Sequence, residues 1–266
     1  MHVSWKRAAF AAAFLVLPLS GWAQTTITLE PSRDTSLFAE PGLDLSNALG
    51  PHLYAGQTNN GDNRRALLAF DFSSIPVGST INSATLTLTQ SMAAPGSTVR
   101  TFTLHRVNGS WGEGTSNAGS PGGTGDSATA GDATWTERIF GSQSWLSPGG
   151  DFVATPSSTS DILSLGGPYD FTGLASDVQA WVGGSAVNDG WILLGEEDDI
   201  RTAYRFESRE NPTATAVPQL AVTFTAPVTG GGGGAGSGNP TAVPGPGPAA
   251  IVLLILAMVL VSRRWF

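Results

Sequence analysis

The chain has 266 residues, no cysteine and a formal net charge of −8 at pH 7. Over residues 25–226 the imbalance is larger, because 9 arginines and no lysine stand against 21 acidic residues, a net charge of −12. A nucleic-acid-binding domain needs clustered positive charge to replace counterions, so no nucleic-acid partner is expected. The missing cysteines exclude disulfides, thiolate metal sites and cysteine nucleophiles.

Both ends of the chain have the composition of sorting segments. Residues 1–23 combine a basic start, an apolar run and a small-residue end, the pattern of a secretory signal peptide, and the run is short for an uncleaved anchor. Residues 227–248 are rich in glycine and proline and predict a linker. Residues 249–266 predict a hydrophobic helix with a basic end, which contacts the membrane before processing. We therefore expect export through the inner membrane and one folded domain over residues 25–226.

Residues 65–89 carry the clearest strand patterns of this domain. Apolar and polar side chains alternate on both sides of a turn that contains Pro76 and Gly78, and Leu86 and Leu88 alternate with threonines. A period of two places alternate side chains on one face of a strand, and proline and glycine favour the turn. We expect a β-hairpin here, whose leucines and phenylalanines start the core.

Further strand patterns cover much of the domain. They predict strands over residues 26–29, 34–38, 52–55, 99–107, 191–194, 203–208 and 219–225. Leu174, Val178 and Trp181 fall at helical spacing, so one short helix is expected. We expect Thr172 to cap this helix. Residues 109–134 are rich in glycine, serine and threonine and predict a surface loop, because few large apolar side chains are present to bury it.

Motifs of catalysis are absent from the sequence. It contains no His-Glu-x-x-His, no Gly-x-Ser-x-Gly and no phosphate-binding glycine loop. His105 lies in a strand pattern, where we expect a structural role. The protein is therefore not expected to be an enzyme. A polysaccharide-degrading enzyme is an alternative, and it would need two carboxyl groups facing each other across a cleft.

A run of four acids follows the strand pattern at residues 191–194. The run consists of Glu196, Glu197, Asp198 and Asp199. We expect these acids to remain ionised and solvated. Hard cations take oxygen ligands of this kind, so the run is also a weak candidate for a structural calcium site, although it lacks the spacing of a known calcium loop. A second weak candidate is the set Asp34, Asp44 and Asn47. No organic cofactor is expected.

Tryptophans give the sharper indication of function. Sugar-binding surfaces stack aromatic rings on the apolar faces of pyranose rings, while nearby polar groups bind the hydroxyls. The candidate carbohydrate-binding residues, in or beside the irregular middle region, are Trp111, Trp135, Trp145, Arg138 and Glu113. The alternative is that the three tryptophans cover the end of the core, which we expect of Trp135 more than of the other two. Trp181 and Trp191 lie in patterned segments and are expected in the core.

Several short pieces occur in a fixed order along the domain. They are residues 65–89, Ser110-Trp111-Gly112-Glu113-Gly114, Ala133-Thr134-Trp135, Trp145 with residues 148–151, residues 169–172 with Trp181, residues 206–210, and Pro218-Gln219-Leu220. This ordered set resembles the DNRLRE family of secreted β-sandwich modules, which is also grouped as a carbohydrate-binding module family. The resemblance implies a jelly-roll sandwich and a non-catalytic accessory module that binds polysaccharide.

The C-terminal segment carries a second resemblance. Val243-Pro244-Gly245-Pro246 precedes the apolar run and the basic end. This three-part arrangement resembles a PEP-CTERM-type sorting signal, with glycine where glutamate is usual. The resemblance implies recognition by an exosortase-type sorting enzyme in a Gram-negative bacterium that makes exopolysaccharide.

The sequence therefore predicts an all-β protein: a single jelly-roll-like β-sandwich with one short helix, an N-terminal signal peptide and a C-terminal hydrophobic helix. The expected function is non-catalytic binding of extracellular polysaccharide at the cell envelope or surface, or in the extracellular matrix. The alternatives are a structural exopolysaccharide-matrix or adhesion protein without a sugar pocket, and an enzyme that degrades polysaccharide.

Overall fold

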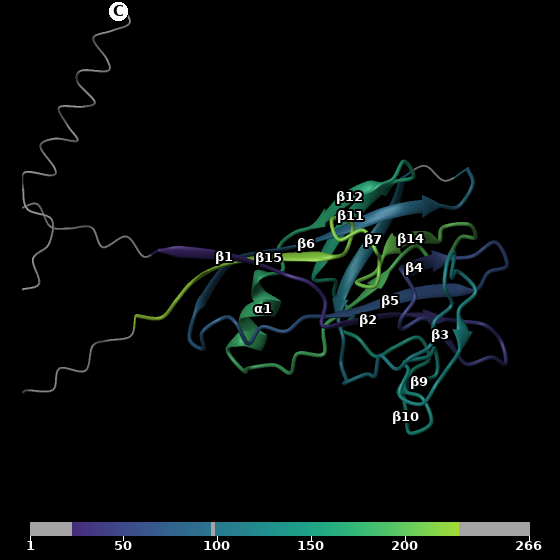
Figure 1. Cartoon of the computed structure of the whole chain (residues 1–266), viewed down its shortest axis with the longest axis horizontal. Coiled ribbons are helices and arrows are strands. Elements are labelled where there is room, and N and C mark those ends of the chain that lie inside the picture. The colour runs from purple at the N-terminus through teal and green to yellow at the C-terminus, as the bar shows by residue number, and fades with distance from the viewer. Residues whose placement is uncertain (1–22, 97–98, 229–266) are drawn as a thin grey trace, which may run out of the picture. The chain divides into compact units, whose positions relative to one another are not determined.

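Figure 1 shows the computed structural model, in which residues 23–96 and 99–228 are described. Nearly all of the predicted signal peptide and linker, and the whole predicted hydrophobic helix, lie outside the described residues and stay predictions. No helix in the described part of the chain is long and apolar enough to cross a membrane. Residues 23–96 and 99–227 belong to one compact unit.

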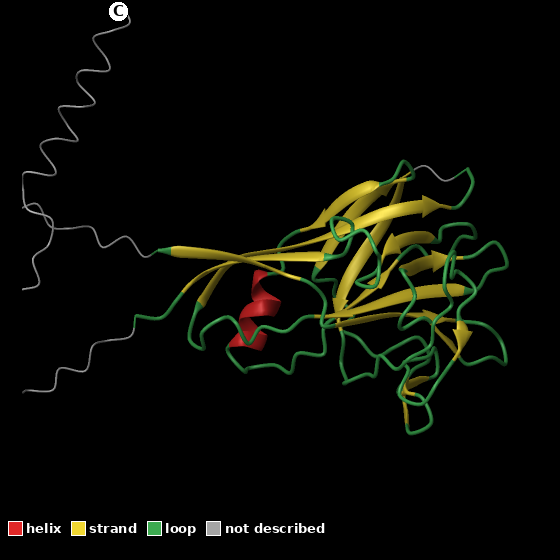
Figure 2. Cartoon of the chain, in the orientation of Figure 1, coloured by secondary structure: helices red, strands yellow, loops and turns green. Residues whose placement is uncertain are grey.

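Strands make up most of the regular structure, and one helix accompanies them among the described residues (Figure 2). The all-β prediction is therefore confirmed. The strands are β1 (Gln24–Leu29), β2 (Arg33–Phe38), β3 (Leu45–Ser46), β4 (His52–Gln57), β5 (Asn63–Ala69), β6 (Thr80–Ala93), β7 (Val99–Arg106), β8 (Asp126–Ser127), β9 (Glu137–Ile139), β10 (Gln143–Ser144), β11 (Ser158–Leu163), β12 (Gly167–Phe171), β13 (Trp191–Leu194), β14 (Tyr204–Glu207) and β15 (Gln219–Thr225). The helix is α1 (Ala175–Val182).

Eleven of these strands form one antiparallel sheet, which curls into a half-barrel with a sandwich-like arrangement. The order along the sheet is β1-β15-β6-β14-β4-β5-β13-β7-β11, with β12 paired to β6 and β2 paired to β5. One half of the sheet therefore holds β1, β15, β6, β12 and β14, and the other holds β2, β5, β13, β7 and β11. Strand β4 joins the two halves through its pairings with β14 and β5.

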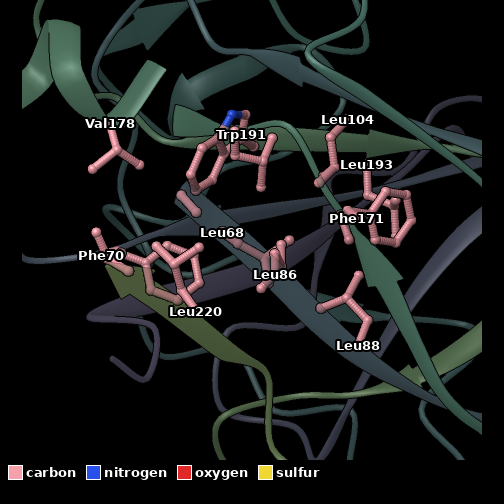
Figure 3. Close-up of a cluster of buried hydrophobic side chains, with 14 of the residues drawn as sticks. Leu68, Phe70, Leu86, Leu88, Leu104, Phe171, Val178, Trp191, Leu193 and Leu220 are labelled. Atoms are coloured by element: carbon pink, nitrogen blue, oxygen red, sulfur yellow. The ribbon is translucent and has the colours of Figure 1, made fainter. Parts of the chain in front are cut away.

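The main core lies inside the curl, where side chains of the two halves meet (Figure 3). Leu86 and Leu88 of β6 and Leu68 of β5 are fully buried there, as are Leu104 of β7 and Trp191 of β13. Burying a leucine side chain contributes about 1.5–3 kcal/mol relative to leaving it exposed. This cluster is therefore the main source of stability for a domain without disulfides.

The expected hairpin at residues 65–89 is wrong, although both strand patterns are confirmed. Strand β5 pairs with β2, β4 and β13, whereas β6 pairs with β12, β14 and β15. Residues 70–79 connect one half of the sheet to the other, which is longer than the two to five residues typical of a hairpin connection. Alternation places Leu68 and Leu86 on buried faces but does not select the neighbouring strand.

Helix α1 occupies the predicted place and closes one end of the core. Leu174 and Val178 are fully buried and Trp181 is 9% exposed, as their helical spacing predicts. The capping prediction for Thr172 is wrong, because Leu174 is the N-cap residue and no side chain caps the helix. Gly184, at a φ of 70°, ends the helix and donates its N–H to the carbonyl of Trp181.

Residues 109–134 are mostly irregular and lie largely at the surface, as the composition predicts, but they also contribute buried side chains to the core. They help to cover the outer face of β5 and β13, where Trp111 and Ala133 join a second apolar cluster with Leu67 and Ile192. Small residues let this segment pack closely, since a Cβ atom on Gly112 would lie 1.8 Å from the carbonyl oxygen of Gly131. Strand β5 is therefore buried on both faces.

Candidate functional site

Trp111 and Trp145, two of the three candidate sugar-binding tryptophans, lie in this second cluster. They are 1% and 5% exposed. Their indole N–H groups donate to the backbone carbonyls of Asp189 at 2.8 Å and Thr134 at 3.0 Å, respectively. A ring without an accessible face cannot stack on a sugar, so the structure places both residues in the core alternative.

Trp135 is the tryptophan of this set that reaches the surface. It is half-buried and lines an open pocket of about 510 Å³. The lining residues are Ala39, Glu40, Pro41, Gly42, Leu43, Asp44, Trp135, Thr136 and Pro148. The segment after β2 thus faces the segment that precedes β9. The stronger expectation of a core role for Trp135 than for the other two is wrong, because that ring is the one at a pocket.

Arg65 of β5 holds the Trp135 ring in place. Its guanidinium carbon lies 4.8 Å from the indole centroid, a distance at which a cation is attracted to the ring. Arg65 Nε and Nη2 donate to the two carboxylate oxygens of Glu197 at 2.7 and 2.6 Å, and Nη1 donates to the carbonyl of Gly149 at 2.7 Å. A bidentate pair of this kind fixes the guanidinium plane, and therefore the ring that packs on it.

Gly149 completes the support of the indole ring. Its N–H donates to the carbonyl of Trp135 at 2.6 Å. A Cβ atom at Gly149 would lie 2.8 Å from Cζ2 of Trp135 and 2.5 Å from Nη1 of Arg65, and the φ of Gly149 is 92°. Glycine is therefore required here both by its backbone conformation and by the closeness of the ring.

Polar groups of the pocket are a hydroxyl and two carboxylates. Thr136 Oγ1 donates to Oδ1 of Asp44 at 3.1 Å, and both side chains are exposed. Glu40 accepts from Nη2 of Arg64 at 3.3 Å. These two carboxylates are the residue types of a glycosidase. Both already have partners, and the pocket lining contains no arginine, lysine or histidine.

Arg138 and Glu113 do not line the Trp135 pocket. Arg138 donates to the backbone carbonyl of Ser110 at 2.8 Å. Glu113 accepts two hydrogen bonds from Arg209, each 2.9 Å long, and one of 2.8 Å from the backbone N–H of Asp34. Neither of these two predicted site residues therefore lines the pocket at Trp135.

Asp34, Glu113 and Glu210 form a group of carboxylates that the sequence did not reveal. One oxygen of each lies within 4.8 Å of the others, and this is the one such group of three among residues 23–96 and 99–228. A hard cation takes oxygen ligands of this kind. Here Arg209 supplies the positive charge, since it also pairs with Glu210 at 2.8 Å and donates its backbone N–H to Asp34 at 2.9 Å. The group is thus an internal ion-pair network.

Two buried oxygens of this network, Oδ1 of Asp34 and Oε2 of Glu210, receive no hydrogen bond from a donor group among the described residues. Burial, followed by the nearby charge of Glu210, raises the pKa of Asp34 well above its ordinary range. Burial also raises the pKa of Glu210. These two carboxyl groups are therefore placed to keep a proton, which would remove one charge from a buried site.

The acidic run after β13 does not gather around one point. Glu196 pairs with Arg100 at 2.6 Å, whereas Glu197 pairs with Arg65 at 2.6 Å. The expectation of four solvated acids is therefore wrong for these two. The carboxylates of Glu196 and Glu197 pair with two different arginines, so the geometry gives no support to a calcium site there.

The second calcium candidate, Asp34 with Asp44 and Asn47, is also not assembled. Asp34 belongs to the Arg209 network and Asp44 to the pocket. Asn47 is buried and uses its side chain on the backbone, donating to His52 and accepting from Ala118, both at 2.9 Å.

Comparison with known proteins leaves the site to be interpreted from its own residues. The chain matches no protein-family model and no curated protein.

Proposed function

We propose that this protein is an exported, envelope-sorted, non-catalytic module that binds extracellular polysaccharide in the Trp135 pocket. The observation that carries the proposal is the half-buried indole of Trp135, which is fixed by Arg65 and lies beside the Thr136 hydroxyl in a pocket. An apolar sugar face would stack on such a ring, while the hydroxyl and carboxylate oxygens would bind sugar hydroxyls.

Pocket size and rigidity support this choice. The volume of about 510 Å³ falls in the range of about 300–1,000 Å³ that is typical of small-ligand sites. Because the ion pair between Arg65 and Glu197 holds the ring before a ligand arrives, little side-chain entropy would be lost on binding.

Export and sorting rest on the terminal segments of the sequence alone. The signal peptide over residues 1–23 would direct the chain across the inner membrane. The signal that begins near Val243 would present it to an exosortase-type enzyme. The family resemblance also implies that this all-β fold is a jelly roll, and we include that finer classification in the same proposal.

A glycan screen tests the function directly. Residues 24–227, which form one compact unit with their own core, would be applied to immobilised polysaccharides of different composition. We expect binding that Trp135→Ala abolishes and Trp135→Phe largely keeps. Leu146→Ala is the control, because that side chain is 94% exposed and does not line the pocket. Binding that Trp135→Ala leaves unchanged would contradict the assignment of the site. Release of sugar from a bound polymer would show that the protein is an enzyme.

A further inference from the structure

The exposed charged residues of this domain are mostly acidic. Eight acids are exposed: Glu30, Asp44, Asp71, Asp126, Asp161, Asp170, Asp198 and Asp199. The arginines at positions 25–226 are all described, and Arg201 is the one that is exposed. A surface of this kind attracts polycations and repels polyanions.

Five of the less exposed arginines form ion pairs, and Asp199 is the one exposed acid among their partners in the described part of the chain. Arg64 pairs with Glu40, and Arg65 with Glu197. The others in ion pairs are Arg100 with Glu196, Arg106 with Asp177, and Arg209 with Glu113. Arg33 lies over the Trp111 ring, 4.3 Å from its centroid. None of the nine arginines of the domain lines the Trp135 pocket.

The titratable side chains that line the Trp135 pocket are acidic, like most of the exposed charged residues of the domain. These lining residues are Glu40 and Asp44. Asp44 is exposed, and in the described part of the chain Thr136 is the one side chain that donates to its carboxylate. The pocket thus offers an exposed carboxylate beside an aromatic ring, and its lining includes no arginine, lysine or histidine to pair with a ligand's carboxylate.

These observations identify the sugar type that fits, given that the proposed sugar-binding function holds. We propose that the pocket selects polysaccharide with free amino groups, a glucosamine-type polymer, over neutral and uronate polymers. The ammonium group would donate charge-assisted hydrogen bonds to Asp44, while the apolar face of the ring lies on Trp135. N-acetylation removes that charge, and a uronate would face the exposed Asp44 with the same sign of charge.

The experiment compares three soluble oligomers of equal length: glucosamine, N-acetylglucosamine and glucuronate. Affinities would be measured by calorimetry below the pKa of the sugar amine, for the domain and for the full chain in detergent. We expect the glucosamine oligomer to bind about tenfold more tightly than the N-acetylated one, the size of one charge-assisted hydrogen bond. The glucuronate oligomer should bind most weakly.

Asp44→Asn tests the assignment to this pocket, and Asp170→Asn is its matched control. Both aspartates are exposed and accept a threonine hydroxyl, Asp44 from Thr136 at 3.1 Å and Asp170 from Thr87 at 2.6 Å. Asp44→Asn should remove most of the preference for free amine, and Asp170→Asn should keep it. Equal losses in both variants would mean diffuse attraction of a polycation and would overturn the proposal.

The outcome separates failure of this inference from failure of the proposed function. If Trp135→Ala abolishes binding but the wild type prefers the N-acetylated or the uronate oligomer, the amine selectivity is wrong and the sugar site stands. If Trp135→Ala leaves the affinity for all three oligomers unchanged, the site itself is wrong.

Discussion

The guanidinium of Arg65 lies 4.8 Å from the centroid of the Trp135 ring and at the same time forms a bidentate ion pair with Glu197. Arg65 thus connects Trp135, which follows the irregular segment, to Glu197 of the acidic run. This contact explains why Trp135 is fixed although it is only half-buried, and it makes the ring a suitable platform for a sugar.

Arg65→Lys should hold the Trp135 ring less firmly while keeping a long cationic side chain at position 65. Lysine keeps the charge but loses the planar group and the second hydrogen bond to Glu197. We expect affinity for the bound polysaccharide to fall about fivefold, equivalent to about 1 kcal/mol. The measurement is calorimetry on the domain. Arg100→Lys is the matched control, because Arg100 also pairs with a glutamate at 2.6 Å, and it should bind as the wild type does. Equal affinity of all three proteins would contradict the role of Arg65.

Substituting each of two adjacent leucines tests the double burial of β5. Leu68 belongs to the main core and Leu67 to the second cluster, and both are fully buried. Leu67→Ala and Leu68→Ala should each lower the free energy of unfolding by about 2–5 kcal/mol in urea denaturation. If residues 109–134 did not cover β5, Leu67→Ala would cost less than about 1 kcal/mol, as at a surface position.

Asp34→Asn tests the buried carboxyl pair through the pH dependence of stability. Burial and Glu210 raise the pKa of Asp34 well above 3.8. A folded-state pKa above the unfolded one stabilises the fold while the carboxyl is protonated. That contribution is fully present below the unfolded pKa and is lost as the pH rises through the folded one. The free energy of unfolding of the wild type, relative to Asp34→Asn, should therefore increase as the pH falls from neutrality toward 3.8.

Urea denaturation at several pH values measures this difference. Glu210→Gln should behave in the same direction, because burial also raises the pKa of Glu210, and it serves if Asp34→Asn does not fold. Asp161→Asn, a change at an exposed acid of β11, should show no comparable trend. A difference that stays constant, or that grows as the pH rises, would contradict the raised pKa of Asp34.

Local patterns predicted the elements of this fold better than their partners. The alternation in β6 is confirmed, with Leu86 and Leu88 buried and Thr85 and Thr87 half-buried. The hairpin prediction failed because alternation gives the faces of a strand and not its neighbours. Leu67 breaks simple alternation for a physical reason, since both faces of β5 are covered.

The site was less predictable than the fold. The sequence singled out three tryptophans of the irregular region, but no periodicity shows which of them is covered. Trp111 and Trp145 are buried in the second cluster against β5, whereas Trp135 stays half-buried, and only the tertiary packing distinguishes them. Asp34, Glu113 and Glu210 belong to segments far apart in the chain, so no local spacing could indicate that they meet.

The central claim is that a sugar binds on Trp135, and fluorescence titration of residues 24–227 with the best-binding polysaccharide tests it most directly. Trp111, Trp145, Trp181 and Trp191 are buried, so Trp135 is the tryptophan of this unit whose environment a surface ligand changes most. We predict a saturable change in tryptophan emission that disappears in Trp135→Phe, while that variant still binds in an independent assay. A saturable change of the same size in Trp135→Phe would contradict the account.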